Sequence, residues 1–202
     1  MAPVLSKRDR LPIAGVESVK KPIEGEVTWA RHDLMGISVA VAFHYLTGEF
    51  HVFMDDNIAE LPALLQQANV VSGFNIIGFD VPLVNATVKQ LSEVPMYTRA
   101  DNIYDLLLES RIANGWRHGD KFPSGMKLDD HLRGTFGQDA MKTANGAEAP
   151  LMWKRGELGK LISYCIDDVK RECMLFERAY AGIPLKTEIH GWAQLRNPNC
   201  QM

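Results

Sequence analysis

The sequence predicts an α/β domain built on a mixed β-sheet, and three observations carry this prediction. The apolar, β-branched segment Leu34–Tyr45 is followed by the turn Thr47-Gly48 and a second apolar segment, Glu49–Met54, which is the pattern of an antiparallel hairpin. Segments with helical spacing alternate with short apolar runs further along the chain. A long amphipathic helix is predicted over Glu157–Tyr180. Strands with helices between and after them are typical of a partly antiparallel sheet flanked by helices.

The remaining elements follow from local patterns. Further strands are predicted over Leu11–Glu17 and Asn69–Phe74, and the short run Ile103–Leu108 fits either a strand end or a helix start. Further helices are predicted over Asn57–Gln67, Val81–Leu91 and Met126–Phe136. Glycine, proline and charged residues predict loops over Lys20–Asp33, Asn114–Gly125 and Gly137–Pro150. Gly182 and Pro184 end the last helix.

Length and composition fit one domain. The chain has 202 residues, of which 46% are hydrophobic and 23% are charged, the balance of a soluble globular protein. We expect a flexible arm over residues 1–10, one domain over 11–182 and a C-terminal tail over 183–202. The net charge of −3 means that any contact with nucleic acid must come from local basic patches. Three cysteines and no long apolar run favour a cytoplasmic protein without a membrane segment.

A first group of polar residues follows a predicted buried strand. The stretch Phe74–Asp80 has the sequence FNIIGFD, in which the strand ends in Asn75 and a new helix begins with Asp80. Such a position brings one carboxylate to the edge of a sheet, beside a helix N-terminus. An ordinary N-cap is the alternative interpretation of Asp80, because aspartate favours that position strongly.

A second group lies within the long C-terminal helix. Tyr164 and Asp168 are one helical turn apart, so both project from one face, beside the apolar stripe that contains Cys165 and Val169. A carboxylate at the edge of a buried stripe has to be paired, metal-bound or partly exposed. A helix salt bridge is the alternative interpretation of Asp168.

Together these two stretches resemble the second and third motifs of the DEDD superfamily of 3′–5′ exonucleases, in the variant whose third motif is Tyr-x3-Asp. The likeness is to predicted exonucleases related to the proofreading domains of DNA polymerases. It extends from Leu11 to Tyr180 and includes the stretches Lys127–Leu132 (KLDDHL) and Leu151–Gly156 (LMWKRG). The resemblance implies a ribonuclease H-like fold, in which a mixed five-stranded sheet with an antiparallel hairpin is flanked by helices.

The first motif departs from the family. The family has Asp-x-Glu on its first strand, and the matching residues here are Gly15 and Glu17. Strict alternation along the strand puts Ile13, Gly15 and Glu17 on one face. Glu17 therefore stands where the family has its glutamate, while Gly15 replaces the aspartate.

The resemblance implies a metal-dependent 3′–5′ exonuclease that hydrolyses phosphodiester bonds at DNA or RNA 3′ ends. Two Mg²⁺ or Mn²⁺ ions, roughly 3.5–4 Å apart, are implied. Glu17 and Asp168 hold the metal on the side of the attacking water, Asp80 faces the other metal, and Tyr164 orients the water. Glu17, Asp80 and Asp168 are then expected to converge. Because Gly15 has no side-chain oxygen, we expect at most one weakly bound ion.

Three interpretations of Gly15 are open. The protein is a catalytically degenerate module that keeps the fold and binds nucleic acid or a regulatory partner. Alternatively, another carboxylate takes the place of the missing aspartate, with Asp33 the least unsuitable. The third interpretation is that position 15 has been altered from its natural residue.

The partner implied by the resemblance is nucleic acid, in particular single-stranded 3′ ends, with a polymerase or another replication protein as a second partner. Basic side chains near an aromatic ring suit a single strand, because the ring can stack on a base. The residues expected to contact nucleic acid are Asn75, Arg111, Trp116, Arg117, Lys121, Lys127 and Lys142. For Trp116, packing inside its loop is the alternative interpretation.

Overall fold

The structure is a computed structural model that describes residues 13–20, 31–91, 94–140 and 148–198, and for 13–20 and Asp139 it describes the backbone alone. A five-stranded sheet has the order β3-β2-β1-β4-β5. Its strands are β1 (Ile13–Lys20), β2 (Ile37–His44), β3 (Glu49–Phe53), β4 (Val71–Gly73) and β5 (Ile103–Asp105). β1 pairs with β4, and β4 with β5, in parallel, whereas β2 is antiparallel to both β1 and β3. The predicted α/β class and the predicted hairpin are therefore confirmed.

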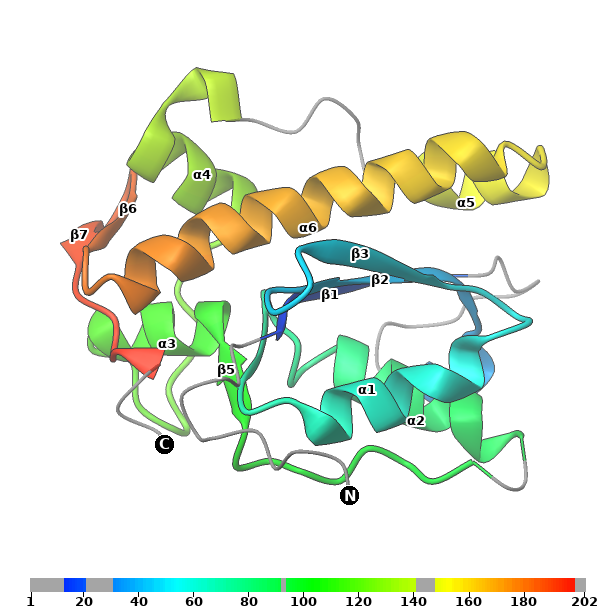
Figure 1. The fold of residues 1–202 in the computed structure, drawn as a ribbon. Helices are drawn as coiled ribbons and strands as arrows, with labels where there is room; N and C mark the ends of the chain where they lie inside the picture. Colours follow the sequence, from blue (N-terminus) through cyan, green and yellow to red (C-terminus); the bar gives the residue numbers. More distant parts are fainter. Residues whose placement is uncertain (1–12, 21–30, 92–93, 141–147, 199–202) are drawn as a thin grey trace.

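Both faces of this sheet are buried, as β2 shows. Val39 and Val41 pack on one face with α6 (Leu158–Tyr180). Ala40 and Ala42 pack on the other face with α1 (Leu61–Gln67) and α2 (Asp80–Lys89). Figure 1 shows α6 lying across one face of the sheet and α1 and α2 covering the opposite face. The continuous apolar sequence of β2 follows from this burial on two sides.

The position of α6 follows from its sequence. Leu161, Cys165, Val169 and Phe176 recur at helical spacing, and each is at most 1% exposed. They form the stripe that packs on β1 and β2. With 23 residues, α6 is the longest helix among the described residues, and it spans about 35 Å. It therefore extends over the central strands β1 and β2.

The other described helices are α3 (Leu106–Ala113), α4 (Leu128–Phe136), α5 (Ala149–Lys154) and the 3₁₀ turns His32–Leu34, Ile58–Glu60 and Gln138–Ala140. None of the described helices is long and apolar enough to cross a membrane. Ile103–Leu108, which fits two patterns, divides into the whole of β5 and the start of α3. The predicted helix Asn57–Gln67 divides into a 3₁₀ turn and α1, because the Asn57 side chain accepts a hydrogen bond from Met54 N instead of capping the helix.

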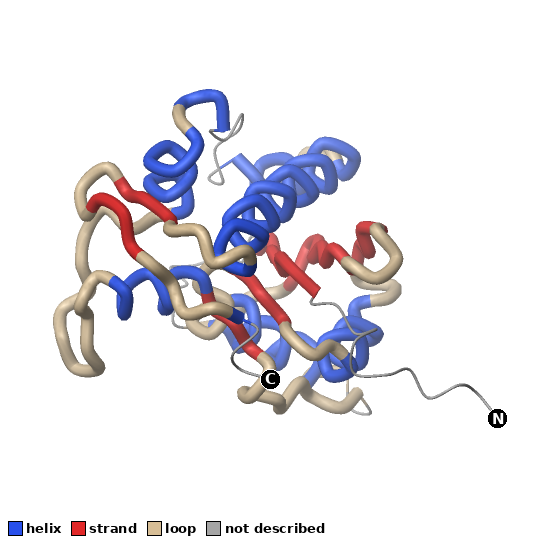
Figure 2. The backbone as a smooth tube through the Cα atoms, turned by 60° about the vertical axis from the view of Figure 1, so that its left-hand side comes forward, coloured by secondary structure: helices blue, strands red, loops and turns tan. Residues whose placement is uncertain are grey.

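The segment after α6 is more than a tail. Leu185–Thr187 (β6) and Gly191–Ala193 (β7) form a two-stranded antiparallel ribbon that packs on α4. Figure 2 shows this ribbon beside α4, apart from the main sheet. Close packing needs Gly134, because a Cβ at that position would lie 2.4 Å from the carbonyl oxygen of Lys186. Three-residue strands give little periodicity, so the sequence pattern does not reveal them.

Candidate active site

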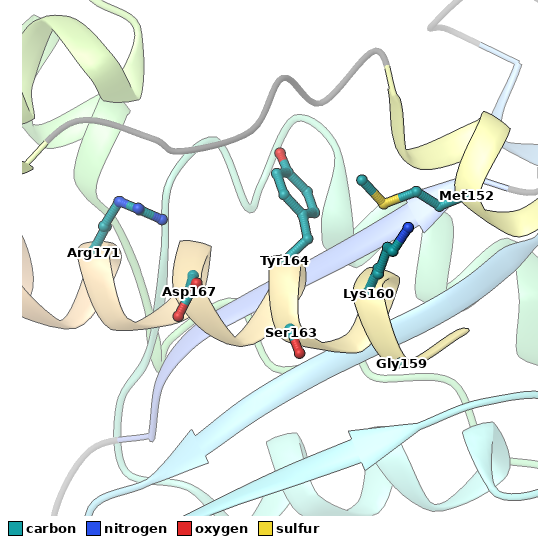
Figure 3. Close-up of a pocket in the computed structure, with 7 residues that line it drawn as sticks. All are labelled: Met152, Gly159, Lys160, Ser163, Tyr164, Asp167 and Arg171. Atoms are coloured by element: carbon teal, nitrogen blue, oxygen red, sulfur yellow. The ribbon is translucent and has the colours of Figure 1, made fainter. Parts of the chain in front are cut away.

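The third motif opens onto a groove along α6. Tyr164 lines this groove, which has a volume of about 350 Å³, together with Lys160 and Arg171. Figure 3 shows the Tyr164 ring rising from α6 with Lys160 and Met152 on one side and Arg171 on the other. The remaining residues that line the groove are Gly159, Ser163 and Asp167. Asp167 lines the same groove and Lys160 pairs with Glu157 at 3.2 Å, so the groove carries charges of both signs. Lys160 and Arg171 are its cationic side chains, the kind that binds phosphate.

Asp168 lies one turn beyond Tyr164 and is fully buried. Its Oδ1 is 3.7 Å from an Nη of Arg171, whose side chain is only 14% exposed. Asp168 therefore forms a helix salt bridge, as the alternative interpretation of this residue predicted. A buried carboxylate beside a guanidinium is already matched in charge, which lowers its attraction for a further cation.

A second hollow, of about 440 Å³, continues the groove toward α5. Met152 and Lys160 line both hollows. The other residues that line the second hollow are Glu148, Leu151, Arg155 and Glu157. Cationic and acidic side chains therefore alternate along the two hollows, and Lys160 pairs with Glu157 at 3.2 Å.

Asp80 is the first residue of α2, and it is only 5% exposed. Phe79 holds the N-cap position, so the interpretation of Asp80 as an N-cap does not hold. Asp80 and Asp168 belong to helices that cover opposite faces of the sheet. The convergence of Glu17, Asp80 and Asp168 stays a prediction.

The turn between β4 and α2 is held by Asp105 at the end of β5. The Asp105 carboxylate accepts hydrogen bonds from the backbone N–H groups of Asn75 and Ile77, each at 3.1 Å. It also caps α3 through the N–H groups of Leu107 and Leu108. Burial raises the pKa of Asp105, and these four hydrogen bonds oppose the rise. Asn75, with φ of 66°, therefore shapes the turn that leads to Asp80.

The first motif lies on a strand that does not alternate strictly. Ala14 pairs with Phe43 and Val16 with Ala42, so the extra residue between them, Gly15, forms a β-bulge. The expectation that Ile13, Gly15 and Glu17 share one face by simple alternation is therefore wrong. After the bulge Glu17 pairs with Val41. Glycine in a strand often marks such a bulge.

The Glu17 side chain lies outside what the structure describes. Among the side chains that are described, no three His, Cys, Asp or Glu residues come together as a metal site.

Asp33 does not fit the place of the missing aspartate. Its carboxylate is exposed and pairs with Arg31 at 2.7 Å, which lowers the pKa of Asp33. Its carbonyl accepts a hydrogen bond from the side chain of Gln90, the C-cap of α2. Asp80 is at the other end of that helix, about 15 Å away along the axis. The compensating-carboxylate interpretation therefore loses its best candidate.

The loop predicted to contact nucleic acid contains an aromatic and cationic cluster. The Trp116 and Phe122 rings are 5.6 Å apart, and the Arg111 guanidinium lies 4.1 Å from the centre of the Phe122 ring. Burial lowers the pKa of Arg111, which remains a cation. Trp116 Nε1 donates to the carbonyl of Asp120, so packing inside the loop is part of its role.

Of the other residues expected to bind nucleic acid, Arg117 and Lys121 are exposed on the same loop. Lys127 precedes α4, where its backbone N–H donates to the Asp130 carboxylate. Lys142 lies outside the described residues.

Sequence analysis alone missed three residues of this region. Lys160 and Arg171 flank Tyr164, and spacings of four and seven residues could have found them, because both place a residue on the same helix face. No comparable spacing in the sequence points to Asp105. Its role depends on the pairing of β4 with β5, which is a tertiary contact.

Comparison with known proteins supports the fold. No family model and no curated protein matches the sequence. The structure is similar to that of the family B DNA polymerase from the hyperthermophilic archaeon Pyrobaculum calidifontis, with a TM-score of 0.56 and 16% sequence identity. The similarity covers 83% of this chain and 24% of the polymerase chain. At this identity it shows a shared fold, corresponding to about a quarter of the polymerase.

Proposed function

We propose that this protein is a 3′–5′ exonuclease-type domain of the DEDD superfamily that binds single-stranded 3′ ends in the groove beside Tyr164. One observation carries the proposal. Tyr164 lines a groove between Lys160 and Arg171, one helical turn from the buried Asp168. This is the arrangement expected of a Tyr-x3-Asp motif that faces a phosphodiester.

The fold supports the same proposal. The mixed five-stranded sheet with its antiparallel hairpin agrees with the ribonuclease H-like sheet that the resemblance implies. The polymerase that shares the fold acts, by its name, on DNA. Both point to a substrate of DNA or RNA for this chain.

The donor set fits a single hard cation better than two. Asp80 and Asp168 are buried carboxylates, the ligands that Mg²⁺ and Mn²⁺ prefer, and Glu17 lies on the central strand β1. Gly15 supplies no oxygen, and Arg171 already neutralises Asp168. We therefore propose at most one weakly bound ion, held by Glu17, Asp80 and Asp168. When bound, the ion lowers the pKa of water and stabilises charge on the phosphate.

The chain's own residues have separate tasks in this proposal. Lys160 and Arg171 hold the phosphates of the terminal nucleotides as charge-assisted hydrogen-bond donors. The Tyr164 hydroxyl orients water beside the scissile phosphodiester. Asp168 fixes Arg171 and shares in binding the ion.

The test is digestion of a 5′-labelled single-stranded oligonucleotide with Mg²⁺ or Mn²⁺ and with a chelator. Shortening from the 3′ end that requires metal and is lost in Asp168→Asn supports an exonuclease. Tyr164→Phe keeps the ring but loses the hydroxyl, so it should slow digestion without weakening binding. Digestion that Asp168→Asn leaves unchanged would refute the assignment of the site.

A second candidate is a non-catalytic module that binds nucleic acid on the same fold. The ion pair between Arg171 and Asp168 favours it, because a guanidinium then supplies the positive charge that a metal supplies in a nuclease. Binding of oligonucleotide that is equally tight with and without a chelator, together with no digestion, would identify this second function.

A further inference from the structure

The outer face of the β6–β7 ribbon carries an exposed tryptophan between two cations. Trp192 is 56% exposed. The Arg178 guanidinium lies 5.4 Å from a Trp192 ring centre, and the Lys186 ammonium lies 5.7 Å from one. Lys186 and Trp192 are direct cross-strand partners. An exposed indole flanked by cations offers a stacking surface and phosphate contacts in one place.

The ribbon that carries this patch is firmly anchored. The Thr135 hydroxyl donates to the Lys186 carbonyl at 3.1 Å and accepts from the Lys186 N–H at 2.9 Å. On the inner face Leu185 and Thr187 are each 2% exposed. Arg178 Nε donates to the Pro184 carbonyl at 2.8 Å, which holds the guanidinium beside the residue that precedes β6. A patch held in this way loses little conformational entropy when a ligand binds.

Two acidic groups near the patch make contacts with other residues. Glu188, in the turn between β6 and β7, pairs with Arg133 of α4 at 3.3 Å. Glu177, which precedes Arg178, accepts a hydrogen bond from Tyr45 at 2.9 Å. Tyr45 is neutral and leaves Glu177 its charge, so the positive charge of the patch rests on Arg178 and Lys186, the two cations that lie against Trp192.

The patch also lies along the same helix as the groove. Arg171 and Arg178 follow Tyr164 by one and two heptads, so all three lie within about 40° on one face of α6. Arg178 is about 21 Å from Tyr164 along the helix axis. Figure 1 shows the C-terminal end of α6 reaching the β6–β7 ribbon. A strand bound at Tyr164 can therefore reach the patch once it is several nucleotides long.

We propose that Trp192, Lys186 and Arg178 form a second contact for single-stranded nucleic acid, in which a base stacks on Trp192 and the two cations bind phosphates. The inference extends the proposed function, because it makes binding at the groove depend on substrate length. Stacking on an aromatic ring accepts any base, so the contact adds affinity without sequence preference.

The experiment compares labelled dT12 with dT2 by fluorescence anisotropy. At roughly 3.4 Å per nucleotide in a stacked strand, dT12 spans both sites and dT2 only one. Trp192→Ala should weaken dT12 binding about tenfold and leave dT2 binding unchanged. Trp192→Phe should restore most of the affinity, because it keeps an aromatic ring. Circular dichroism and thermal melting check that each variant folds.

A charge variant gives an independent measurement. Lys186→Gln should reduce the slope of log affinity against log salt by about 0.7 for dT12. Lys89→Gln is the matched control, because it removes one positive charge from an exposed side chain at the end of α2. It should leave the slope unchanged.

The outcomes separate the two proposals. Folded Trp192→Ala with unchanged dT12 affinity, or a Lys186→Gln slope equal to that of the control, would overturn the second contact alone. Lys160→Gln should weaken both oligonucleotides through the groove. If it has no effect while Trp192→Ala still weakens dT12, the groove assignment fails and the second contact stands. A wild-type protein that binds neither oligonucleotide would overturn both.

Discussion

The Asp105 carboxylate accepts a hydrogen bond from the backbone N–H of Ile77 at 3.1 Å, and this contact ties the end of β5 to the turn that leads to Asp80. The same carboxylate holds Asn75 and caps α3. A single side chain thus fixes the geometry of the second motif, although Asp105 lies 25 residues away from Asp80 in the sequence.

We predict that Asp105→Ala lowers the free energy of unfolding by about 2–4 kcal/mol, because one buried and three partly buried N–H groups lose their acceptor. Urea unfolding followed by circular dichroism measures the change. Asp101→Ala is the control, since that carboxylate is 74% exposed and pairs with Arg99 at the surface. A loss for Asp105→Ala no larger than that of the control would contradict the role given to Asp105.

Restoring the aspartate of the first motif at position 15 should increase metal-dependent digestion. Gly15→Asp is expected to raise Mg²⁺-dependent 3′–5′ digestion on the order of 100-fold, because an added carboxylate stabilises the bound cations. The Gly15 bulge lies beside β4, next to the turn that carries the second motif. Digestion of a labelled oligonucleotide measures the gain, and adding Asp168→Ala should abolish it. Equal, strong digestion by the wild-type protein would mean that another ligand already compensates.

The ion pair on α6 should oppose metal binding. Arg171→Gln is expected to tighten Mn²⁺ binding about tenfold, or about 1.4 kcal/mol, because the guanidinium 3.7 Å from Asp168 repels a second cation. Isothermal titration calorimetry measures the affinity. Lys170→Gln removes an exposed cation that pairs with Asp167 on the same helix and should have little effect. Equal affinities in the two variants would show that Arg171 does not compete with the metal.

Stability should fall in mild acid through His131. Burial lowers the pKa of His131 below its ordinary 6.5, and its Nδ1 donates to the Lys127 carbonyl while its Nε2 accepts from the Ser110 hydroxyl. Below pH 6.5 the unfolded chain takes up a proton before the folded protein does. The contribution of neutral His131 is therefore complete above pH 6.5 and declines as the pH falls.

Urea unfolding between pH 7.5 and 5.5 tests this expectation. The loss of stability with acid should be smaller in His131→Gln than in the wild-type protein. Identical pH dependence in the two proteins would assign the titration to other groups.

The close contact between α4 and β6 predicts that substitution by alanine has opposite effects on stability at two glycines. Gly134→Ala should destabilise the protein by about 1–3 kcal/mol, because the new Cβ would lie 2.4 Å from a backbone oxygen that cannot move alone. Gly159→Ala should stabilise the protein by up to about 1 kcal/mol, because a Cβ at this position of α6 meets no atom within 4 Å apart from the nearby backbone of its own helix. Thermal unfolding of both variants measures this, and equal effects would contradict the packing of the ribbon.

The local sequence pattern was sufficient to predict several elements of this fold. The hairpin from Ile37 to Phe53 follows from two apolar segments joined by a turn, because burial on both faces makes β2 continuously apolar. The long helix α6 follows from its helical periodicity, because only one of its faces is buried. The spacing of Tyr164 and Asp168 also determined that both project from neighbouring positions of one helix. These features depend on residues close to one another along the chain.

Tertiary structure decided the rest. The bulge at Gly15 depends on how β1 pairs with β2, and a shift of one residue reverses every face that alternation predicts. The support of Asp105 for the Asn75 turn and the patch around Trp192 join residues far apart in sequence, so no local pattern contains them. The sequence by itself determined that the residues proposed for the site, Tyr164 and Asp168, share one helix, whereas only packing decided which carboxylates and cations meet there.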